Sequence, residues 1–431
     1  MVGSVENDNP ARRTQKVTKI ARALACTTAL TCLVVPALAQ DQQLTIWTIS
    51  YQADAQVNAL KRAEEAFEAS HPGVDVEIVM RGVDEHKTAL RVAAGSDSGP
   101  DIYMSWAGLG LGGEYVKAGL SADMSEYYDQ YGWSERLSAP SLAFNSAFAE
   151  GKHGIPFRFS GEGLYYNKAL FDEAGITEVP TTYDELVEVA EQLKQAGIAP
   201  ITFGGTVNWH VMRLMDMLLE AKCGAETNDA LMGMQADWNT TPCATEAFAE
   251  LQKWGADYIL SPFMGIDEAQ SNQLYYAGRA AMALQGDWFV NQLDENTDDL
   301  DNFGVFELPT GTDRLYGFAE YWYIAARADD PDLAAEFLDL FTSDEFQDQI
   351  KGAFGALSVN VNVEVADDAP AMYGDWVELF RNAKGTFVNG DQAFPLDVTT
   401  EYFRVINEVV TGNMEPAAGA AAMQTFIDNL G

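Results

Sequence analysis

Apolar and polar positions in the first third of the chain alternate between two spacings, one typical of strands and one of helices. Residues 44–49 form a short β-rich run, and apolar side chains then recur at helical spacing over 57–67. Residues 74–80 alternate again, a helical segment follows over 87–94, and residues 101–106 form another apolar run. This β-α-β-α-β order predicts an α/β fold with a sheet of parallel strands.

The same style of patterning continues through the middle and the end of the chain. Thr182 and Glu185 form the capping box of a helix whose buried stripe lies in 186–193, and a strand is expected over 198–203. A last helical region is expected over 331–351. About 390 residues with average apolar content leave room for two lobes, so the patterning predicts two α/β lobes.

The first 40 residues carry an export signal. A basic stretch over 12–19 precedes an uncharged run over 23–35, and small residues then lead to Ala39 and Gln40. Such a three-part segment is typical of a secretory signal peptide, and its apolar run is too short to span a membrane. Residues 1–39 are therefore predicted to be removed, with cleavage near Ala39/Gln40 and a mature protein in the periplasm.

Two variants of this signal stay open. Arg12 and Arg13 form a pair that a twin-arginine export signal also contains, but the apolar residues usually found after such a pair are missing. Cys26 and Cys32 are candidate lipid-attachment cysteines, although the residues before them fit poorly. General secretion is the preferred interpretation.

The charge of the mature chain restricts its partners. Removing residues 1–39 takes away five of the 26 basic residues and two of the 65 acidic ones, which leaves 21 against 63, a net charge of -42. Such a charge repels nucleic acid and anionic lipid. No run of five or more like charges occurs, so the acidic residues are expected on a solvated surface, while a cationic ligand such as a polyamine remains compatible.

Cys223 and Cys243 are the two cysteines of the mature chain. Two cysteines that close a short loop in an oxidising compartment favour a disulfide over a metal site. With 19 residues between them, the bridge would stabilise the fold by about 3 kcal/mol in the chain-entropy model. A pair of free thiols is the alternative.

Four stretches of the chain carry a resemblance to a known family. Singly they are weak, but their order and spacing are specific. They are Ala63–Phe67 through His71–Val74 to Gly99–Ile102; Gly154–Pro156 with Leu164–Lys168; Phe171–Ile176 with Pro180–Leu186; and Gly278–Met282 with Gly286–Trp288. On these residues the chain resembles the extracellular solute-binding proteins of family 1, the carbohydrate-binding subunits of bacterial ABC importers.

This resemblance implies the type II periplasmic binding protein fold, in which two hinged lobes close over one ligand and deliver it to membrane permease subunits. The chain would cross between the lobes more than once. The expected N-terminal lobe is 40–155 plus 296–345, and the expected C-terminal lobe is 156–295 plus 346–431. A monomer is expected, with a di- or oligosaccharide as the ligand.

The chemistry of a sugar ligand selects the candidate site residues. Aromatic rings cover the C–H faces of a sugar, while carboxylates, amides and arginines bind its hydroxyl groups. In open α/β sheets such residues lie at the carboxyl ends of strands. The candidates in such positions are Tyr51, Gln52, Trp106, Arg158, Trp209, Asp287, Trp288, Glu320 and Trp322. The resemblance implies a cleft position for Trp106 and Trp288, which we expect to make the strongest contacts.

A glycine-rich motif competes with this interpretation. Residues 108–113 fit the pattern G-x-G-x-x-G of dinucleotide-binding turns. The motif follows the third expected strand, whereas such a fingerprint usually opens the first β-α-β unit. No cofactor is therefore predicted, and a flexible turn that admits the ligand beside Trp106 is the simpler hypothesis.

Three other functions are alternatives. A secreted glycoside hydrolase would need two carboxyl groups about 5 to 9.5 Å apart, and Asp287 with Glu320 are the candidates. The same fold could instead bind a polyamine, through carboxylates and aromatic rings, or a glycerol phosphate, through arginines such as Arg81 and Arg158. The four histidines are scattered without ligand spacing, so no metal site is predicted. The sequence predicts a binding protein and no enzyme.

Overall fold

The computed structural model describes residues 42–93, 99–367 and 369–430. The predicted signal peptide lies outside these residues. None of the helices within them is both long enough and apolar enough to cross a membrane. The strands are β1 (Gln42–Ile49), β2 (Val74–Arg81), β3 (Ile102–Trp106), β4 (Ile155–Asn167), β5 (Ile201–Thr202), β6 (Met282–Gly286), β7 (Phe303–Phe306), β8 (Leu315–Ile324) and β9 (Thr386–Phe387).

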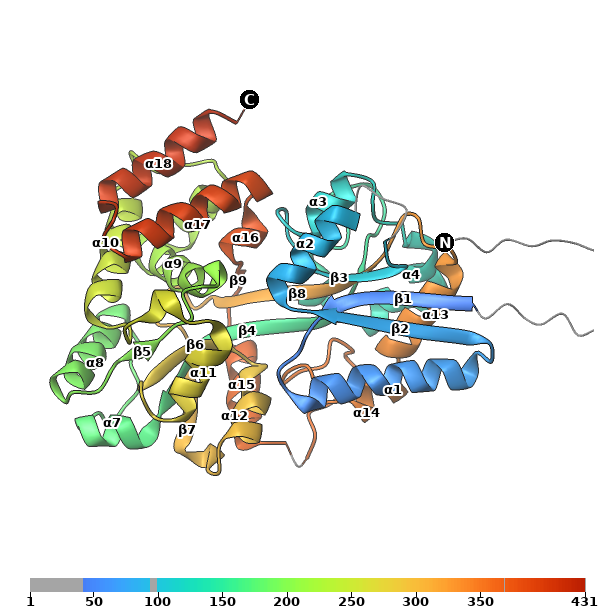
Figure 1. Ribbon diagram of the computed structural model, residues 1–431, viewed down its shortest axis with the longest axis horizontal. Coiled ribbons are helices and arrows are strands. Elements are labelled where there is room, and N and C mark those ends of the chain that lie inside the picture. Colours follow the sequence, from blue (N-terminus) through green and yellow to red (C-terminus); the bar gives the residue numbers. More distant parts are fainter. Residues whose placement is uncertain (1–41, 94–98, 368, 431) are drawn as a thin grey trace, which may run out of the picture. The chain divides into compact units, whose positions relative to one another are not determined.

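These strands form one sheet in the order β2-β1-β3-β8-β4-β6-β5, with β7 beside β4 and β9 beside β8. β1 pairs in parallel with β2 and β3, as the β-α-β-α-β pattern predicts. The sheet is mixed, because β8 runs antiparallel to both β3 and β4. β4 and β8 are buried along almost their whole length and extend through both lobes (Figure 1).

The N-lobe, defined as residues 42–154 and 325–363, has its core on one face of β1–β3. Its helices are α1 (Asp54–Ser70), α2 (Val83–Ala93), α3 (Gly112–Lys117), α4 (Ser125–Tyr131), α5 (Trp133–Arg136), α6 (Ala139–Leu142), α13 (Pro331–Thr342) and α14 (Asp344–Gln349). Phe67 of α1 packs on Phe337 of α13 in this core. Leu90 of α2 and Val116 of α3 belong to a smaller cluster on the other face.

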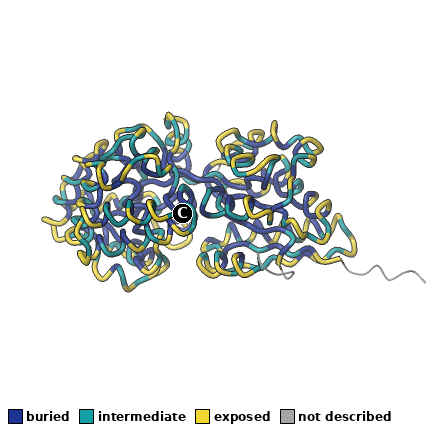
Figure 2. Tube along the Cα trace, turned by 90° about the horizontal axis from the view of Figure 1, so that it is seen from above, coloured by how far each residue is buried: buried dark blue, intermediate teal, exposed yellow. Residues whose placement is uncertain are grey.

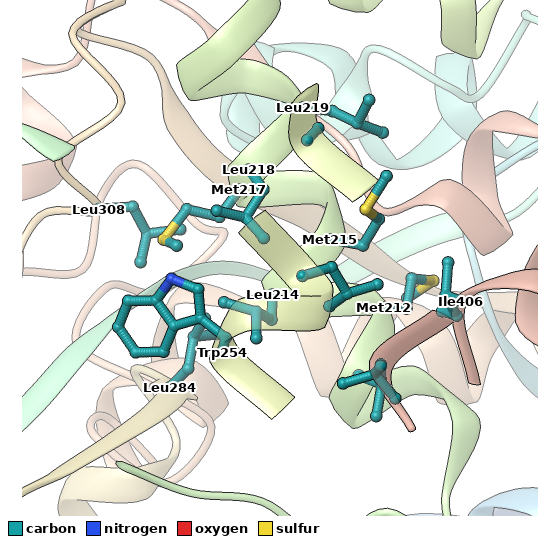
Figure 3. Packing of buried hydrophobic residues seen from close by; sticks show 14 of the residues in the cluster. Met212, Leu214, Met215, Met217, Leu218, Leu219, Trp254, Leu284, Leu308 and Ile406 are labelled. Atoms are coloured by element: carbon teal, nitrogen blue, oxygen red, sulfur yellow. The ribbon is translucent and has the colours of Figure 1, made fainter. Parts of the chain in front are cut away.

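The C-lobe, defined as residues 168–314 and 364–430, is mostly helical. Its helices are α7 (Lys168–Ala174), α8 (Tyr183–Gln195), α9 (Asn208–Met232), α10 (Pro242–Asp257), α11 (Glu268–Tyr276), α12 (Phe289–Asn296), α15 (Ala371–Asn382), α16 (Gly390–Ala393), α17 (Leu396–Val410) and α18 (Pro416–Asp428), with short 3₁₀ turns at Phe263–Gly265 and Leu300–Asn302. Figure 3 shows Leu214 and Met215 of α9 among Trp254 of α10 and Ile406 of α17. Exposed positions lie on the outside of both lobes, and buried ones follow the connecting strands (Figure 2).

Several local predictions are confirmed. The capping box of α8 forms as expected, because Thr182 accepts from the Glu185 amide while Glu185 accepts from the Thr182 amide. Cys223 and Cys243 form a disulfide that links α9 to α10, with their Cα atoms 5.2 Å apart. The predicted two-lobed α/β architecture is also present.

Two expectations differ from the structure. The helix expected over 331–351 is broken at Ser343, whose backbone is extended and whose hydroxyl caps α14 by accepting from the Phe346 amide. The expected lobe boundaries at 296 and 345 differ from the packing: β7 pairs with β4 in the C-lobe, whereas Phe346 and Phe354 belong to the N-lobe core. Apolar contacts decide where the chain passes from one lobe to the other. The sequence at these points does not have the composition of a linker.

Candidate functional site

A cleft with about 730 Å³ of empty space, open solvent included, lies where β1, β3, α9, β8 and α16 converge. Each lobe contributes side chains to it, and β4 and β8 form its floor. Its wall consists of Ile49, Ser50, Tyr51, Gln52, Gln56, Val83, Lys87, Trp106, Arg158, Trp209, Arg213, Glu268, Trp288, Gln292, Phe318, Glu320, Asn389, Asp391 and Gln392. The cleft therefore lies at the strand ends where the sequence predicts a site.

The N-lobe side of the cleft follows from where two parallel strands end. β1 ends at Ile49, and the chain turns through Tyr51 and Gln52 before α1 begins. β3 ends at Trp106, which lies opposite Glu320 in the antiparallel pairing with β8. Because neighbouring parallel strands end at the same edge of a sheet, these side chains meet in the cleft.

A buried arginine holds the floor of the cleft together. Arg158 lies opposite Glu320 in the pairing of β4 with β8, and its guanidinium is 3.6 Å from Glu320 and 3.4 Å from Asp287. Burial raises the pKa of Asp287 to about 6, although Arg158 counters part of this effect. Burial also raises the pKa of Glu320, again against the effect of Arg158. Arg158 thus compensates two buried carboxyl groups.

A second buried arginine lies on α9. Arg213 is four residues after Trp209 and therefore on the same face of the helix. Its Nε is 3.0 Å from Glu162 Oε2, and its Nη1 donates to Gln285 at 3.2 Å. Burial raises the pKa of Glu162 to about 7, and Arg213 limits the shift.

Three tryptophans contribute aromatic surface, each beside a cation. Trp288 is only 9% exposed, and its ring lies 5.0 Å from the guanidinium carbon of Arg158 and 5.1 Å from that of Arg213. Trp209 lies 4.4 Å from the same atom of Arg213, and Trp106 lies 4.8 Å from Lys87 Nζ. Trp106 and Trp209 are half-buried and offer more ring surface than Trp288.

The two lobes also bind each other across the cleft. Gln52 donates to Glu268 at 3.0 Å, and Lys87 of α2 forms an ion pair with Asp391 of α16 at 3.2 Å. α2 and α16 lie on the same side of β4 and β8 (Figure 1). The walls of the cleft are therefore in contact in this structure.

The glycine-rich segment has a packing role that differs from the flexible turn expected from the sequence. Leu109 donates its backbone N–H to the Gln392 carbonyl at 2.6 Å. A Cβ on Gly108 would lie 2.4 Å from the Gln392 Cβ, and one on Gly110 would lie 2.2 Å from the Phe394 carbonyl oxygen. Glycine at these positions allows the N-lobe turn to approach α16 closely.

Seven of the nine candidate residues line the cleft, and two do not. The seven are Tyr51, Gln52, Trp106, Arg158, Trp209, Trp288 and Glu320. Asp287 lies beneath the wall, where it binds Arg158 and accepts from the Ala356 amide at 3.3 Å. Trp322 lies fully buried in the N-lobe core, packed on Phe157. Trp322 shares a face of β8 with Phe318 and Glu320, but it lies further into the N-lobe, opposite Met104 of β3.

Sequence reasoning missed several wall residues. Arg213 could have been found from its spacing of four after Trp209, which places both on one face of a helix. Lys87 lies on α2, and Asp391 and Gln392 lie on a four-residue helix far along the chain. No local pattern in the sequence marks Lys87, Asp391 or Gln392 as wall residues. Only the folding of the chain brings α2 and α16 to the same cleft.

Comparisons with known proteins agree with this geometry. Residues 50–348 match the family described as bacterial extracellular solute-binding protein. A probable sugar-binding periplasmic protein of Mesorhizobium japonicum is 30% identical over 254 residues, which cover 57% of this chain and 58% of that protein. An uncharacterized ABC transporter extracellular-binding protein of Pyrococcus horikoshii is 22% identical over 80% of this chain and 79% of its own length.

Solved structures of similar fold include a chitin oligosaccharide binding protein, with a TM-score of 0.83 and 23% identity over 90% of this chain and 98% of that one. The solute-binding protein RafE in complex with raffinose has a TM-score of 0.74 and 18% identity over 90% of this chain and 98% of that one. At these identities the likeness establishes the fold, which is that of the type II solute-binding proteins.

Proposed function

Because the chain belongs to the bacterial extracellular solute-binding protein family, we propose that it binds a neutral sugar between its lobes and delivers it to the membrane permease of an ABC importer. The probable sugar-binding relative and the oligosaccharide-binding structures of the same fold support this ligand class. Export by the N-terminal signal and action as a monomer in the periplasm are parts of the same proposal.

The observation that carries the proposal is the balance of charge in the cleft. Three cations and three carboxylates line it: Lys87, Arg158 and Arg213 against Glu268, Glu320 and Asp391. Lys87 pairs with Asp391, and Arg158 pairs with Glu320. Arg213 pairs with Glu162 beneath the wall, and Glu268 accepts from Gln52 at 3.0 Å and lies 3.8 Å from His210 Nε2. Charges that already have partners inside the protein favour a neutral ligand, because a charged one would bring an unpaired charge into a buried site.

The remaining polar atoms suit hydroxyl groups. The Trp209 indole N–H and the side-chain oxygens of Asn389 and Gln392 are buried and have no hydrogen-bond partner among the described residues. A sugar hydroxyl both donates and accepts, so a polyol can satisfy the donor and the acceptors together. The rings of Trp106 and Trp209 provide flat apolar surface for the C–H faces of the same ligand.

Two of the three alternative functions, polyamine binding and glycoside hydrolysis, fit the arrangement less well. A polyamine needs carboxylates free to face its ammonium groups, but Glu320 and Asp391 already bind Arg158 and Lys87, and Glu268 accepts from Gln52. Hydrolysis would need Asp287 and Glu320 on opposite sides of a glycosidic bond, and Asp287 does not line the cleft. Asp287 and Glu320 both bind the guanidinium of Arg158, so they hold the floor of the cleft together.

A thermal-shift screen tests the proposal directly. The purified mature protein is heated with mono-, di- and trisaccharides, among them chitin oligosaccharides and raffinose, and with putrescine and spermidine. We expect a saturable rise in melting temperature with one class of neutral sugar, because a ligand that binds only the folded state stabilises it. The bound sugar is then recovered and its length measured. A polyamine response would overturn the ligand class, and a shortened sugar would establish a hydrolase instead.

A further inference from the structure

The cleft continues beyond the cavity described above. A second cavity, with about 1280 Å³ of empty space, open solvent included, shares four wall residues with the first: Lys87, Trp106, Trp209 and Asp391. We call the first cavity the inner chamber and the second the outer chamber. The four shared residues, two from each lobe, form the partition between the chambers.

The partition is an ion pair between tryptophans. Lys87 and Asp391 are 3.2 Å apart, and their side chains are only 17% and 7% exposed. Lys87 also lies over the ring of Trp106. Asp391 is held in position by its neighbour Gly390, whose amide donates to Asp216 of α9 at 2.8 Å. The ion pair is therefore built into both lobes and is not a chance contact of two surface chains.

The outer chamber has the same chemistry as the inner one. Three carboxylates and three cations again line it: Asp84, Glu114 and Asp391 against Lys87, Arg91 and Arg404. Tyr115 and Phe403, both half-buried, add aromatic surface on opposite lobes. A neutral ligand that fits the inner chamber thus meets matching surroundings in the outer one.

A buried histidine in the wall of the outer chamber is a separate observation in favour of a ligand there. His86 is fully buried, and its Nε2 lies 2.8 Å from the Met104 carbonyl, to which it must donate. Burial lowers the pKa of His86 to about 4, so the ring is neutral and its Nδ1 carries a lone pair. This Nδ1 has no hydrogen-bond partner among the described residues. Because His86 lines the outer chamber, its wall holds an unused acceptor, the kind of atom to which a hydroxyl group donates.

We propose that the outer chamber is a second ligand subsite and that the Lys87–Asp391 ion pair is a gate between the subsites. A single sugar ring occupies the inner chamber and leaves the gate closed. A linear oligosaccharide passes between Lys87 and Asp391, its hydroxyl groups replace the ion pair, and its further rings lie beside Tyr115 and Phe403. This inference rests on the proposed sugar-binding function and adds chain length to it.

The experiment compares chain lengths in one sugar series. Calorimetric titrations use the monosaccharide, disaccharide and trisaccharide of the series that raises the melting temperature, on the wild type and on Phe403→Ala. We expect the wild type to bind the trisaccharide more tightly than the monosaccharide. Phe403→Ala should weaken trisaccharide binding about tenfold, or about 1.4 kcal/mol, and leave monosaccharide binding within about twofold.

Two further variants make the test specific. Phe426→Ala is the matched control, because Phe426 packs half-buried on the same C-lobe core as Phe403 but lies outside both chambers. Its affinities should equal those of the wild type. Asp391→Asn weakens the gate and should raise the ratio of trisaccharide to monosaccharide affinity.

Three results would overturn the inference. One is equal wild-type affinity for one, two and three rings, and another is an equal loss at every length in Phe403→Ala. The third is trisaccharide affinity in Phe403→Ala that matches Phe426→Ala. Failure of every sugar to bind the wild type would instead overturn the proposed function, so the two failures are distinguishable.

Discussion

Helix α9 buries two stripes of opposite chemistry, and their comparison explains much of the molecule. Val211, Leu214, Met215 and Leu218 form an apolar stripe in the C-lobe core. Trp209, Arg213, Asp216 and Glu220, spaced by four, three and four residues, form a polar stripe. Except for Trp209, which is half-buried, both stripes are fully buried. Apolar side chains need only close packing, whereas each buried polar one needs a specific partner.

The partners of the polar stripe come from distant parts of the chain. Arg213 binds Glu162 of β4, and Glu220 binds Arg314 at 2.7 Å. Asp216 accepts from the hydroxyl groups of Tyr316 and Tyr402, each at 2.7 Å. The polar stripe therefore fixes α9 to β4, β8 and α17 in one register, and it places Trp209 and Arg213 in the cleft.

The largest expected effect comes from leaving a charge of the polar stripe without its partner. Arg213→Met leaves Glu162 buried and unpaired, which should lower the free energy of unfolding by about 3–5 kcal/mol and abolish sugar binding. Urea unfolding and titration calorimetry measure the two effects. The control is Arg314→Met, which unpairs Glu220 outside the cleft and should lower stability while affinity is kept. Loss of binding in both variants would contradict a cleft role for Arg213.

A cavity in the apolar stripe should cost stability alone. Leu214→Ala removes a fully buried side chain and should lower the free energy of unfolding by about 2–5 kcal/mol. Sugar affinity of the folded protein should stay unchanged, because Leu214 does not line the cleft. Val92→Ala, at a position 71% exposed, should change neither quantity. A lower sugar affinity in Leu214→Ala would show that the two stripes are coupled.

The polar stripe should also make stability depend on pH. Burial raises the pKa of Asp216 to about 7, although its hydroxyl and amide donors lower it in part. An unfolded Asp titrates near its ordinary value of about 3.9, so the unfolded chain releases this proton first as the pH rises. Stability is therefore highest below about pH 4 for this group and falls until about pH 7.

Asp216→Asn isolates that contribution. Between about pH 5 and pH 8 the wild type should lose roughly 2–3 kcal/mol more stability than the variant. Denaturant unfolding at a series of pH values gives the difference. Equal slopes for the two proteins would mean that Asp216 stays ionised in the folded state.

The smallest expected effect is on ligand affinity alone. Replacing Trp209 or Trp106 by Ala should weaken sugar binding by more than tenfold, about 1.4 kcal/mol, because each ring offers half-buried surface to the cleft. Trp47→Ala is the matched control, since Trp47 is also half-buried, with Arg81 over its ring, but lies outside the cleft. Unchanged affinity in all three variants would place the ligand elsewhere.

The contrast between the stripes also explains what the sequence could and could not predict. Alternating apolar spacing located β1–β3 and α1, and the family resemblance supplied the two lobes. Sugar chemistry and strand ends supplied seven of the nineteen wall residues. The break at Ser343 was missed, because apolar spacing continues through it. Trp322 was misplaced because it shares a face of β8 with Glu320, and only its pairing with Met104 of β3 shows that it lies in the N-lobe core. Lys87 and Asp391 meet only in the folded chain, 304 residues apart.

Salt dependence of sugar binding tests the central claim most directly, because the claim is that the charges of the cleft are compensated inside the protein. The mature protein is titrated calorimetrically at low and at high salt with its tightest-binding sugar, and with spermidine. The account predicts sugar affinity that is the same at both salt concentrations and no binding of spermidine. Tight spermidine binding that weakens at high salt would contradict it. Salt screens the attraction between a cationic ligand and carboxylates, so such a result would mean that the cleft carboxylates are not neutralised by cations of the protein.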